Sequence, residues 1–391
     1  MTIPFNKPFI AGKELHYIAE AVTRGNISGD GYFTQACASL MQERFDVARI
    51  LMTPSCTAAL EMAAQLCDLQ AGDEVIMPSY TFVSTASAFV RMGAKPVFVD
   101  IRPDTMNLDE TLIEEAITDR TRAICVVHYA GVSCEMDRIM AIARGNDLRV
   151  IEDAAQGVNA FWGNRALGSI GDVGCYSFHE TKNFICGEGG ALCINDPELI
   201  SRAEIIRDKG TNRQQLFRGE VDKYTWVDVG SSYVPSEISS AFLFGQLEEM
   251  ERISQRREEI YEIYHVGLRD AAERGELVLP TIPEGCISNH HMFYVLVRDN
   301  ETRNRILGIM SEAGVRAVFH YVPLHSSPVG VQFRQGSTMK QTDSCSERLI
   351  RLPFYYSISS SEQERVIATL CEALSESRVE VSETGHLLGP S

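Results

Sequence analysis

The chain has 391 residues, of which 45% are hydrophobic, and it carries a formal net charge of −17 at pH 7. This length is enough to bury one large core and a smaller one. The negative charge is spread along the chain and argues against a nucleic-acid partner, because binding a nucleic acid requires concentrated lysine and arginine. A small phosphorylated ligand needs only a local pocket and stays compatible with this charge.

Eleven cysteines are scattered along the sequence. They form no CxxC pair and no Cys/His cluster at zinc spacing, so we expect no metal site. Several stand in apolar runs, where a reduced thiol behaves as a small hydrophobe, as is typical of a reducing cytoplasm. The N-terminus lacks the pattern of a signal peptide, and no apolar run is long enough to span a bilayer. We therefore expect a cytoplasmic protein without a membrane partner.

Short apolar runs alternate with amphipathic stretches in the first half of the chain. The expected strands cover residues 50–53, 74–77, 96–100, 123–128, 149–152, 173–178 and 190–194. The expected helices include residues 57–67, 108–117 and 135–144. This alternation predicts an α/β fold, with a mostly parallel seven-stranded sheet covered by helices on both faces.

A long helical pattern starts after Pro235 and Ser236, which are typical start signals. It leads into a region of mixed character, with expected strands at 291–298 and 316–319 and expected helices at 301–313 and 362–375. We therefore expect a large domain over residues 1–250 and a smaller α+β domain over residues 251–376. The polar residues 377–391 are expected to be a disordered tail.

Ligands of parallel sheets bind at the carboxyl ends of the strands, and Lys182 stands just beyond such an end. Its segment, residues 177–183, reads Ser-Phe-His-Glu-Thr-Lys-Asn and is followed by a glycine-rich stretch. A desolvated lysine loses its proton more easily and can form a Schiff base with an aldehyde. Pyridoxal phosphate is the aldehyde that proteins most often hold in this way. The alternative is an ordinary solvated lysine.

Two further strand ends offer groups that suit the phosphate of such a cofactor. The strand at 50–53 runs into small residues that open a helix, where the free N–H groups of Cys56 and Thr57 would form an anion site. The alternative is plain N-capping by Ser55 or Thr57. Ser177, which precedes the lysine, would add a hydroxyl donor.

The remaining strand ends offer groups that suit the cofactor ring. Phe82, after the strand at 74–77, would stack on a flat ring, although an aromatic in the core is the common alternative. Asp153 closes a buried apolar strand, which is costly unless a cation such as a pyridinium N–H lies beside it. It would otherwise cap the next helix. Gln156, one helical turn on, would donate to the ring hydroxyl.

Together these segments resemble the fold-type I, pyridoxal phosphate-dependent sugar aminotransferases of the DegT/DnrJ/EryC1/StrS family over residues 3–375. The resemblance is carried by residues 54–60, 78–82, 152–156 and 177–183. It implies that Lys182 is the Schiff-base lysine and that Asp153 is the partner of the pyridinium nitrogen. The other cofactor contacts that it implies come from Phe82 on the ring, Gln156 at the ring hydroxyl, and Cys56, Thr57 and Ser177 at the phosphate.

Within the family, residues 29–31, 179–182, 209–213, 222–226 and 319–325 resemble members that act on a dTDP-linked sugar. The resemblance implies transfer of an amino group from L-glutamate to the C4 ketone of dTDP-4-dehydro-6-deoxy-D-glucose, which gives dTDP-4-amino-4,6-dideoxy-D-galactose. His179, Tyr321 and His325 match positions near the sugar. The sequence is equally compatible with two alternatives. His179 would then brace the lysine loop, and the other two side chains would be ordinary packing residues.

The resemblance also implies a homodimer whose active sites are shared between subunits. Two departures from the family pattern matter here. Cys56 replaces a common glycine, which a backbone N–H contact tolerates. Ser232 replaces the asparagine that reaches the partner's phosphate, and its hydroxyl has a shorter reach. The arginine that binds the donor's carboxylate is unassigned, with Arg213, Arg218 and Arg316 as candidates.

Several other functions stay open. The acceptor could be a C3 ketone or a GDP- or UDP-linked sugar, or the product could have the gluco configuration. Sugar dehydratases of the same fold replace the lysine with histidine, so Lys182 argues against them. A transcription regulator would need a DNA-binding module, which the sequence does not indicate. A regulatory protein that binds the cofactor without turnover is compatible with the motifs.

Overall fold

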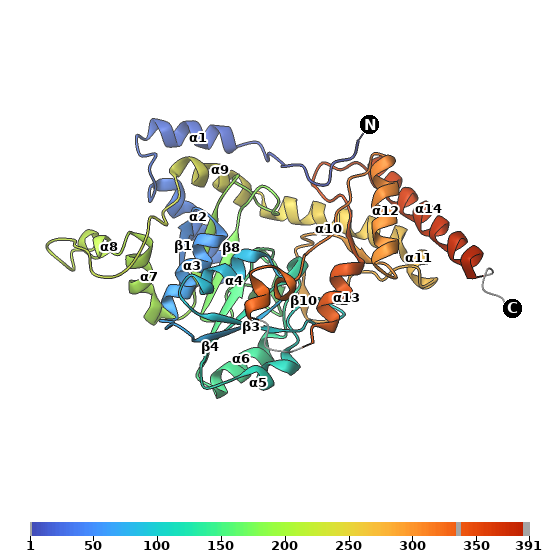
Figure 1. The fold of residues 1–391 in the computed structure, drawn as a ribbon. Coiled ribbons are helices and arrows are strands. Elements are labelled where there is room, and N and C mark those ends of the chain that lie inside the picture. The colour runs from blue at the N-terminus through green and yellow to red at the C-terminus, as the bar shows by residue number, and fades with distance from the viewer. Residues whose placement is uncertain (1, 334–337, 386–391) are drawn as a thin grey trace.

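Seven strands form the main sheet of the computed structural model, which describes residues 2–333 and 338–385 (Figure 1). Their order is β1-β9-β8-β5-β4-β2-β3, and only β9 runs antiparallel to its neighbours. Every expected strand of this sheet is present, with ends shifted by a residue or two. The strands are β1 (Arg49–Thr53), β2 (Glu74–Pro78), β3 (Lys95–Val99), β4 (Thr121–Val127), β5 (Arg149–Asp153), β8 (Val173–Ser177) and β9 (Gly190–Ile194).

Helices cover both faces of this sheet (Figure 1). Successive side chains of a strand point to opposite faces, so Ile151 and Val150 of β5 belong to different apolar clusters. One face packs against α3 (Cys56–Leu66), α4 (Val83–Val90) and α7 (Ile200–Arg207). The other packs against α2 (Tyr32–Phe45), α5 (Ile113–Ala116), α6 (Met136–Gly145) and α9 (Glu237–Leu247). These layers confirm the predicted α/β fold.

The single long helix expected after Pro235 is two helices. Ser236 caps α9 by accepting a hydrogen bond from the Ser239 N–H, and the helix ends at Leu247. Glu249 then leaves helical geometry, with φ of −104° and ψ of 17°, before α10 (Met250–Gly267) begins. The start of α10 packs on the sheet, whereas its end packs in a second core. The break therefore lies where the chain turns from one core toward the other.

The second core is built from the C-terminal part of the chain. It includes residues of α10, α12 (Asn300–Glu312), α14 (Ser360–Gly385) and the paired strands β11 (Tyr294–Leu296) and β12 (Leu349–Arg351). The strand expected at 316–319 is wrong, because Val318 makes only an isolated bridge to Arg351. The division at residue 250 stays a prediction.

The segment expected to be a disordered tail begins as part of α14, which is helical as far as Gly385. Residues 386–391 of that segment lie outside the described residues. The helix expected at 108–117 is a 3-10 turn, Glu110–Leu112, followed by the short α5. None of the helices in the described ranges has the length and apolarity needed to cross a membrane.

The N-terminal segment joins the second core before the chain enters the large sheet. The Ile3 N–H donates to the Gly314 carbonyl at 2.8 Å, and the Ile3 side chain is buried in the second core. Phe5 accepts a hydrogen bond from the Phe354 N–H at 3.1 Å. The chain then forms α1 (Glu14–Thr23), which packs along α9 (Figure 1).

The sequence patterns gave no signal for several short elements. These are α8 (Arg213–Phe217), α11 (Arg269–Glu273), α13 (Lys340–Arg348) and the strands β6 (Phe161–Trp162), β7 (Arg165–Ala166) and β10 (Cys286–Ile287). Residues 208–232 form an arm that carries α8 and projects from the large sheet and its helices (Figure 1).

Candidate active site

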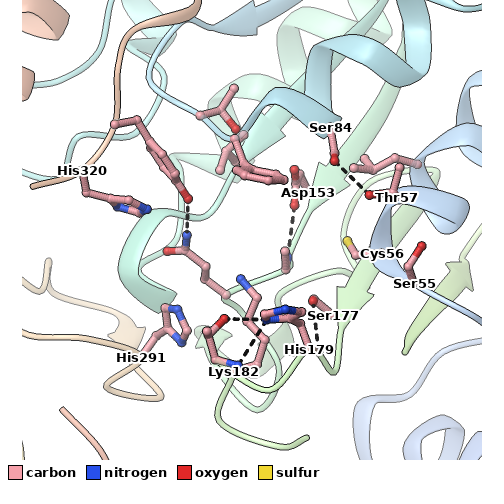
Figure 2. A pocket seen from close by; sticks show the side chains of 18 of the residues that line it. Ser55, Cys56, Thr57, Ser84, Asp153, Ser177, His179, Lys182, His291 and His320 are labelled. Carbon is pink, nitrogen blue, oxygen red and sulfur yellow. Dashed lines mark hydrogen bonds between the residues drawn. The ribbon is translucent and has the colours of Figure 1, made fainter. Parts of the chain in front are cut away.

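A cavity of about 550 Å³ opens at the carboxyl ends of β1, β2, β5 and β8 (Figure 2). Side chains from the N-terminal segment, the large sheet and the C-terminal part line it together. The predicted site residues that it brings together are Cys56, Thr57, Phe82, Asp153, Gln156, Ser177, His179, Lys182 and Tyr321. Ser232 and His325 do not line it.

Lys182 reaches into the centre of this cavity (Figure 2). A tight loop after β8 presents it, with the Lys182 N–H donating to the His179 carbonyl at 2.9 Å and the Cys186 N–H to the Phe178 carbonyl at 2.8 Å. Burial lowers the pKa of the Lys182 amine, and the neighbouring Cys56 and Asp153 oppose that shift. The lysine is therefore a desolvated amine inside a cavity rather than a solvated surface charge.

Asp153 lies at the inner end of the cavity, at the end of β5, and is 5% exposed. Its Oδ2 accepts from the Thr85 hydroxyl at 2.7 Å, and its Oδ1 accepts from the Ala155 N–H at 3.2 Å. Burial raises the pKa of the Asp153 carboxyl, while these hydrogen bonds and Lys182 act against the shift. Among the described residues it has no cation at ion-pair distance, so it suits a ligand that brings a positive N–H of its own.

The start of α3 forms a place for an anion. Ser55 is the N-cap, and it occupies the N–H groups of Ala58, at 3.1 Å to its hydroxyl, and Ala59, at 3.2 Å to its carbonyl. The N–H groups of Cys56 and Thr57 have no hydrogen-bond partner within the described ranges. Capping and anion binding therefore coexist here, because they use different N–H groups. The Thr57 hydroxyl lies 2.8 Å from the Ser84 hydroxyl (Figure 2).

Gly190 of β9 packs directly beneath this start of α3. A Cβ at this position would lie 2.4 Å from the Ser55 carbonyl carbon and 2.5 Å from the Cys56 nitrogen. We expect Gly190→Ala to displace the two N–H groups, to weaken cofactor binding and to lower the free energy of unfolding by about 1–3 kcal/mol. Fluorescence titration with the cofactor and thermal unfolding measure both effects.

Gly308 in α12 provides the matched control, because a Cβ there would meet no atom within 4 Å. Gly308→Ala should leave cofactor affinity unchanged and slightly stabilise the helix. Equal cofactor affinity in Gly190→Ala and the unchanged protein would refute the assignment of this anion site.

The Gln156 amide is fixed at both ends. Its Oε1 accepts from the Ala130 N–H at 2.7 Å, and its Nε2 donates to the Tyr321 hydroxyl at 3.2 Å. Phe82 lines the cavity but is largely exposed, and its ring centre lies 6.4 Å from that of Tyr321. The roles predicted for Gln156 and Phe82 toward a ring stay predictions, and both side chains are within the cavity that such a ring would occupy.

His325 packs behind the cavity. Its Nδ1 lies 2.7 Å from the Ser79 hydroxyl and its Nε2 lies 3.2 Å from an Asp343 oxygen. These are the contacts of a packed side chain, and the role predicted for His325 toward the sugar stays a prediction. His179 does line the cavity, and its Nδ1 also lies 2.9 Å from the Thr181 hydroxyl, which braces the lysine loop.

The three arginines considered for the donor's carboxylate lie elsewhere. Arg213 pairs with Asp208 at 3.7 Å, and Arg218 pairs with Glu204 at 2.7 Å. Arg316 donates to the Ser311 hydroxyl at 2.9 Å. None of them lines the cavity of its own chain.

Sequence reasoning missed four titratable side chains of the cavity wall, Glu188, His291, His320 and Arg351. His291 Nδ1 lies 2.8 Å from the Asn183 amide oxygen, and His320 Nδ1 lies 3.0 Å from the Tyr129 hydroxyl. Burial lowers the pKa of both imidazoles, so both are neutral. Long-range packing alone brings the two histidines and Arg351 to the lysine, and no local pattern indicates it.

The lysine, the unpaired aspartate and the free N–H groups of α3 fit the aldehyde, the ring nitrogen and the phosphate of pyridoxal phosphate. A model of the DegT/DnrJ/EryC1/StrS aminotransferase family matches residues 8–371. The chain is 32% identical to GDP-perosamine synthase of Caulobacter vibrioides, with 94% of this chain and 97% of that one covered. It is 30% identical to dTDP-4-dehydro-2,3,6-trideoxy-D-glucose 4-aminotransferase of Saccharopolyspora spinosa, with 93% and 94% covered.

A solved structure extends the likeness to the cofactor. The fold matches NtdA from Bacillus subtilis with bound cofactor PMP at a TM-score of 0.84, with 27% identity over 93% of this chain and 81% of that one. The chain therefore belongs to the DegT/DnrJ/EryC1/StrS aminotransferase family, and it is a pyridoxal phosphate-dependent aminotransferase.

Proposed function

We propose that this enzyme transfers the amino group of L-glutamate to the C4 ketone of dTDP-4-dehydro-6-deoxy-D-glucose and forms dTDP-4-amino-4,6-dideoxy-D-galactose. This amino sugar would serve the synthesis of a polysaccharide such as enterobacterial common antigen. The observation that carries the proposal is the desolvated Lys182 amine, which lies in one cavity with Asp153 and the start of α3. Of the two similar enzymes quoted above, one is named as the 4-aminotransferase of a dTDP-4-dehydro sugar and the other as a GDP-perosamine synthase.

The proposed roles follow from the positions of the side chains. When bound, the cofactor supplies an electron sink that stabilises negative charge on the carbon beside the transferred nitrogen. Asp153 holds the proton on the ring nitrogen through its carboxylate. The N–H groups of Cys56 and Thr57, with the Ser177 hydroxyl, bind the phosphate. Phe82 and Gln156 orient the ring.

Lys182 is the proposed proton carrier of both half-reactions. As general base its Nζ removes the proton from the α-carbon of glutamate, and as general acid it later delivers a proton to C4 of the sugar. Burial lowers the pKa of this amine, which favours its basic form. Because Lys182 approaches from one side of the cavity only, the sugar face turned toward it decides between galacto and gluco products.

A panel of acceptors tests the proposal. The purified enzyme, loaded with the cofactor, is incubated with L-glutamate and with 4-keto sugars on dTDP, GDP and UDP and a 3-keto dTDP-sugar. We expect amination of the dTDP-linked 4-keto sugar with the highest kcat/KM, and NMR of the product should show an axial amine at C4. An equatorial amine, or a higher kcat/KM with another acceptor, would replace the proposed substrate or product.

We also propose a homodimer with shared active sites. The arm at 208–232 leaves large apolar side chains in solvent, with Phe217 65%, Trp226 76% and Val229 70% exposed. Clusters of this kind are typical of an association surface. Ser232, at the base of the arm, would then donate its hydroxyl to the phosphate in the partner's cavity.

Trp226→Asp should shift the chain from dimer to monomer and reduce its activity at least tenfold, because a buried aromatic at an interface is worth 2 kcal/mol or more, which is about 30-fold in affinity. Analytical ultracentrifugation across a concentration series measures the change. Val266→Asp, on an exposed face of α10, provides the control and should stay dimeric. If the protein without any substitution were a fully active monomer, the proposed homodimer would be refuted.

A further inference from the structure

Arg351 is a charged side chain of the cavity wall, and the described residues supply no ion-pair partner for it. It is the last residue of β12, and its backbone is fixed by pairing with Tyr294 and by a hydrogen bond from its N–H to the Val318 carbonyl at 2.7 Å. Its guanidinium lies over the ring of Phe5, 4.9 Å from the ring centre. Both the strand and this ring therefore hold the guanidinium in place.

The Nε of this guanidinium is not satisfied by the described part of the protein. The buried Nε of Arg351 has no hydrogen-bond partner, and no carboxylate of the described residues lies at ion-pair distance from the side chain. Burying a guanidinium donor without a partner is unfavourable, because water is lost and nothing replaces it. Such a group next to a ligand cavity indicates that an anionic ligand supplies the missing acceptors.

Arg257 shows what a satisfied buried arginine looks like in the same region. It donates to the His290 and His291 carbonyls, with its Nε at 3.0 Å from the first. It does not line the main cavity. Burial is the main cause of the lowered pKa values of Arg257 and His320, and the charge of Arg351 adds to both shifts. Among the described arginines, Arg351 is the one whose side chain lines the main cavity.

We infer that Arg351 binds the α-carboxylate of the amino donor, an inference that rests on the aminotransferase reaction under the proposed function. The nitrogen of the donor must reach the group held by Lys182, and its α-carboxylate is attached to the adjacent carbon. An anion-binding side chain near Lys182 is therefore at the right place for this carboxylate. The Nε and one terminal nitrogen of a guanidinium form a fork that matches the two oxygens of a carboxylate.

The other anions of the reaction fit this position less well. The cofactor phosphate has its own site at the start of α3, which lies on the opposite side of Lys182 from His291 and His320 (Figure 2). The diphosphate of the nucleotide sugar is separated from the reacting C4 by the whole pyranose ring. It would therefore lie nearer the mouth of the cavity than a group beside the reacting nitrogen.

Arg351→Gln and Arg351→Lys test the inference through the donor half-reaction alone. The enzyme with bound cofactor is mixed with L-glutamate, and the change in the visible absorbance is followed by stopped flow without any sugar. We expect the apparent Kd for glutamate to rise at least ~30-fold in Arg351→Gln, since one partner of a charge-assisted pair is removed. Arg351→Lys should recover part of the affinity.

Amide analogues of the donor locate the contact. In the unchanged enzyme, L-isoglutamine, whose α-carboxylate is an amide, should bind much more weakly than glutamate. In Arg351→Gln this difference should shrink toward none, whereas the difference between glutamate and glutamine, its γ-amide, should stay. Calorimetric titration with 2-methyl-L-glutamate, which has no α-hydrogen to lose, gives the same comparison without turnover.

Arg316→Gln, a surface change outside the cavity, is the matched control. It should leave the affinities for glutamate and for its two amides unchanged. Thermal unfolding and cofactor affinity verify that each variant is folded. If Arg351→Gln weakened only the binding of the nucleotide sugar, the assignment of Arg351 would be overturned. The same would hold if the variant abolished only the difference in affinity between glutamate and glutamine. If the unchanged enzyme reacted with no amino acid, the proposed function would fail together with the inference. Donor reaction without amination of the dTDP-sugar would leave the inference standing and remove only the proposed acceptor.

Discussion

Lys182→Ala is expected to lose both the visible absorbance of the lysine-bound cofactor and measurable sugar amination. Alanine offers no amine to bond the aldehyde and no group to carry the proton between the donor and the acceptor. Loss of the general acid/base alone is worth about 10²–10⁴-fold in rate, and loss of the covalent attachment adds to it. Absorbance spectroscopy of the loaded protein and mass spectrometry of the sugar product measure the two effects.

A surface lysine provides the control for this change. Lys13 lies outside the cavity and pairs with Glu248 at 3.1 Å, so Lys13→Ala should keep both the absorbance and the activity. Unaltered visible absorbance in Lys182→Ala would mean that another amine holds the cofactor. Because the loop around Lys182 is held by backbone hydrogen bonds, we expect the variant to unfold at nearly the same temperature as the unchanged protein.

Asp153→Asn is expected to reduce kcat by about 10²–10³-fold and to weaken cofactor binding. Asparagine has almost the same shape but no charge, so it cannot stabilise a proton on the ring nitrogen. Breaking one side of a buried ion pair costs about 3–5 kcal/mol, and each 1.36 kcal/mol in the barrier is tenfold in rate. Steady-state kinetics with saturating cofactor separate the loss in rate from the loss in affinity.

Thr85→Val provides a graded comparison. It removes one hydrogen bond to the carboxylate, from the Thr85 hydroxyl at 2.7 Å, and leaves the charge of Asp153 in place. A buried hydrogen bond to a charged group contributes about 1.5–3 kcal/mol, so the effect should be clearly smaller than that of Asp153→Asn. An Asp153→Asn enzyme as active as Thr85→Val would show that the charge has no role in the reaction.

The parts of the site that the sequence could predict all follow one local rule. Asp153 ends an apolar strand, Thr57 and Lys182 stand within five residues of such an end, and parallel strands end at the same edge of a sheet. The strand pattern is therefore enough to predict that these side chains meet. Residue type then indicates the chemistry, because a buried lysine and a buried aspartate without partners are costly.

The wall formed by the C-terminal part was beyond this rule. The segment at 319–325 contains two histidines, and the resemblance pointed to His325, whereas the structure places His320 in the cavity. The chain turns after Tyr321, and the Leu324 N–H donates to the Ser79 carbonyl at 3.0 Å, which draws His325 behind β2. Contacts between residues so far apart in sequence depend on the tertiary packing of both cores, which periodicity does not contain.

The N-terminal segment has a consequence for how this enzyme can move. Ile3 is bonded to the C-terminal core, and the Asn6 amide donates to the Glu180 carbonyl in the lysine loop at 3.3 Å. A few residues later, the Phe9 carbonyl accepts from the Gln246 amide of α9 at 2.9 Å. A hinge motion between the two cores would have to break one or more of these hydrogen bonds. We therefore expect the width of the cavity around Lys182 to change little when a substrate binds.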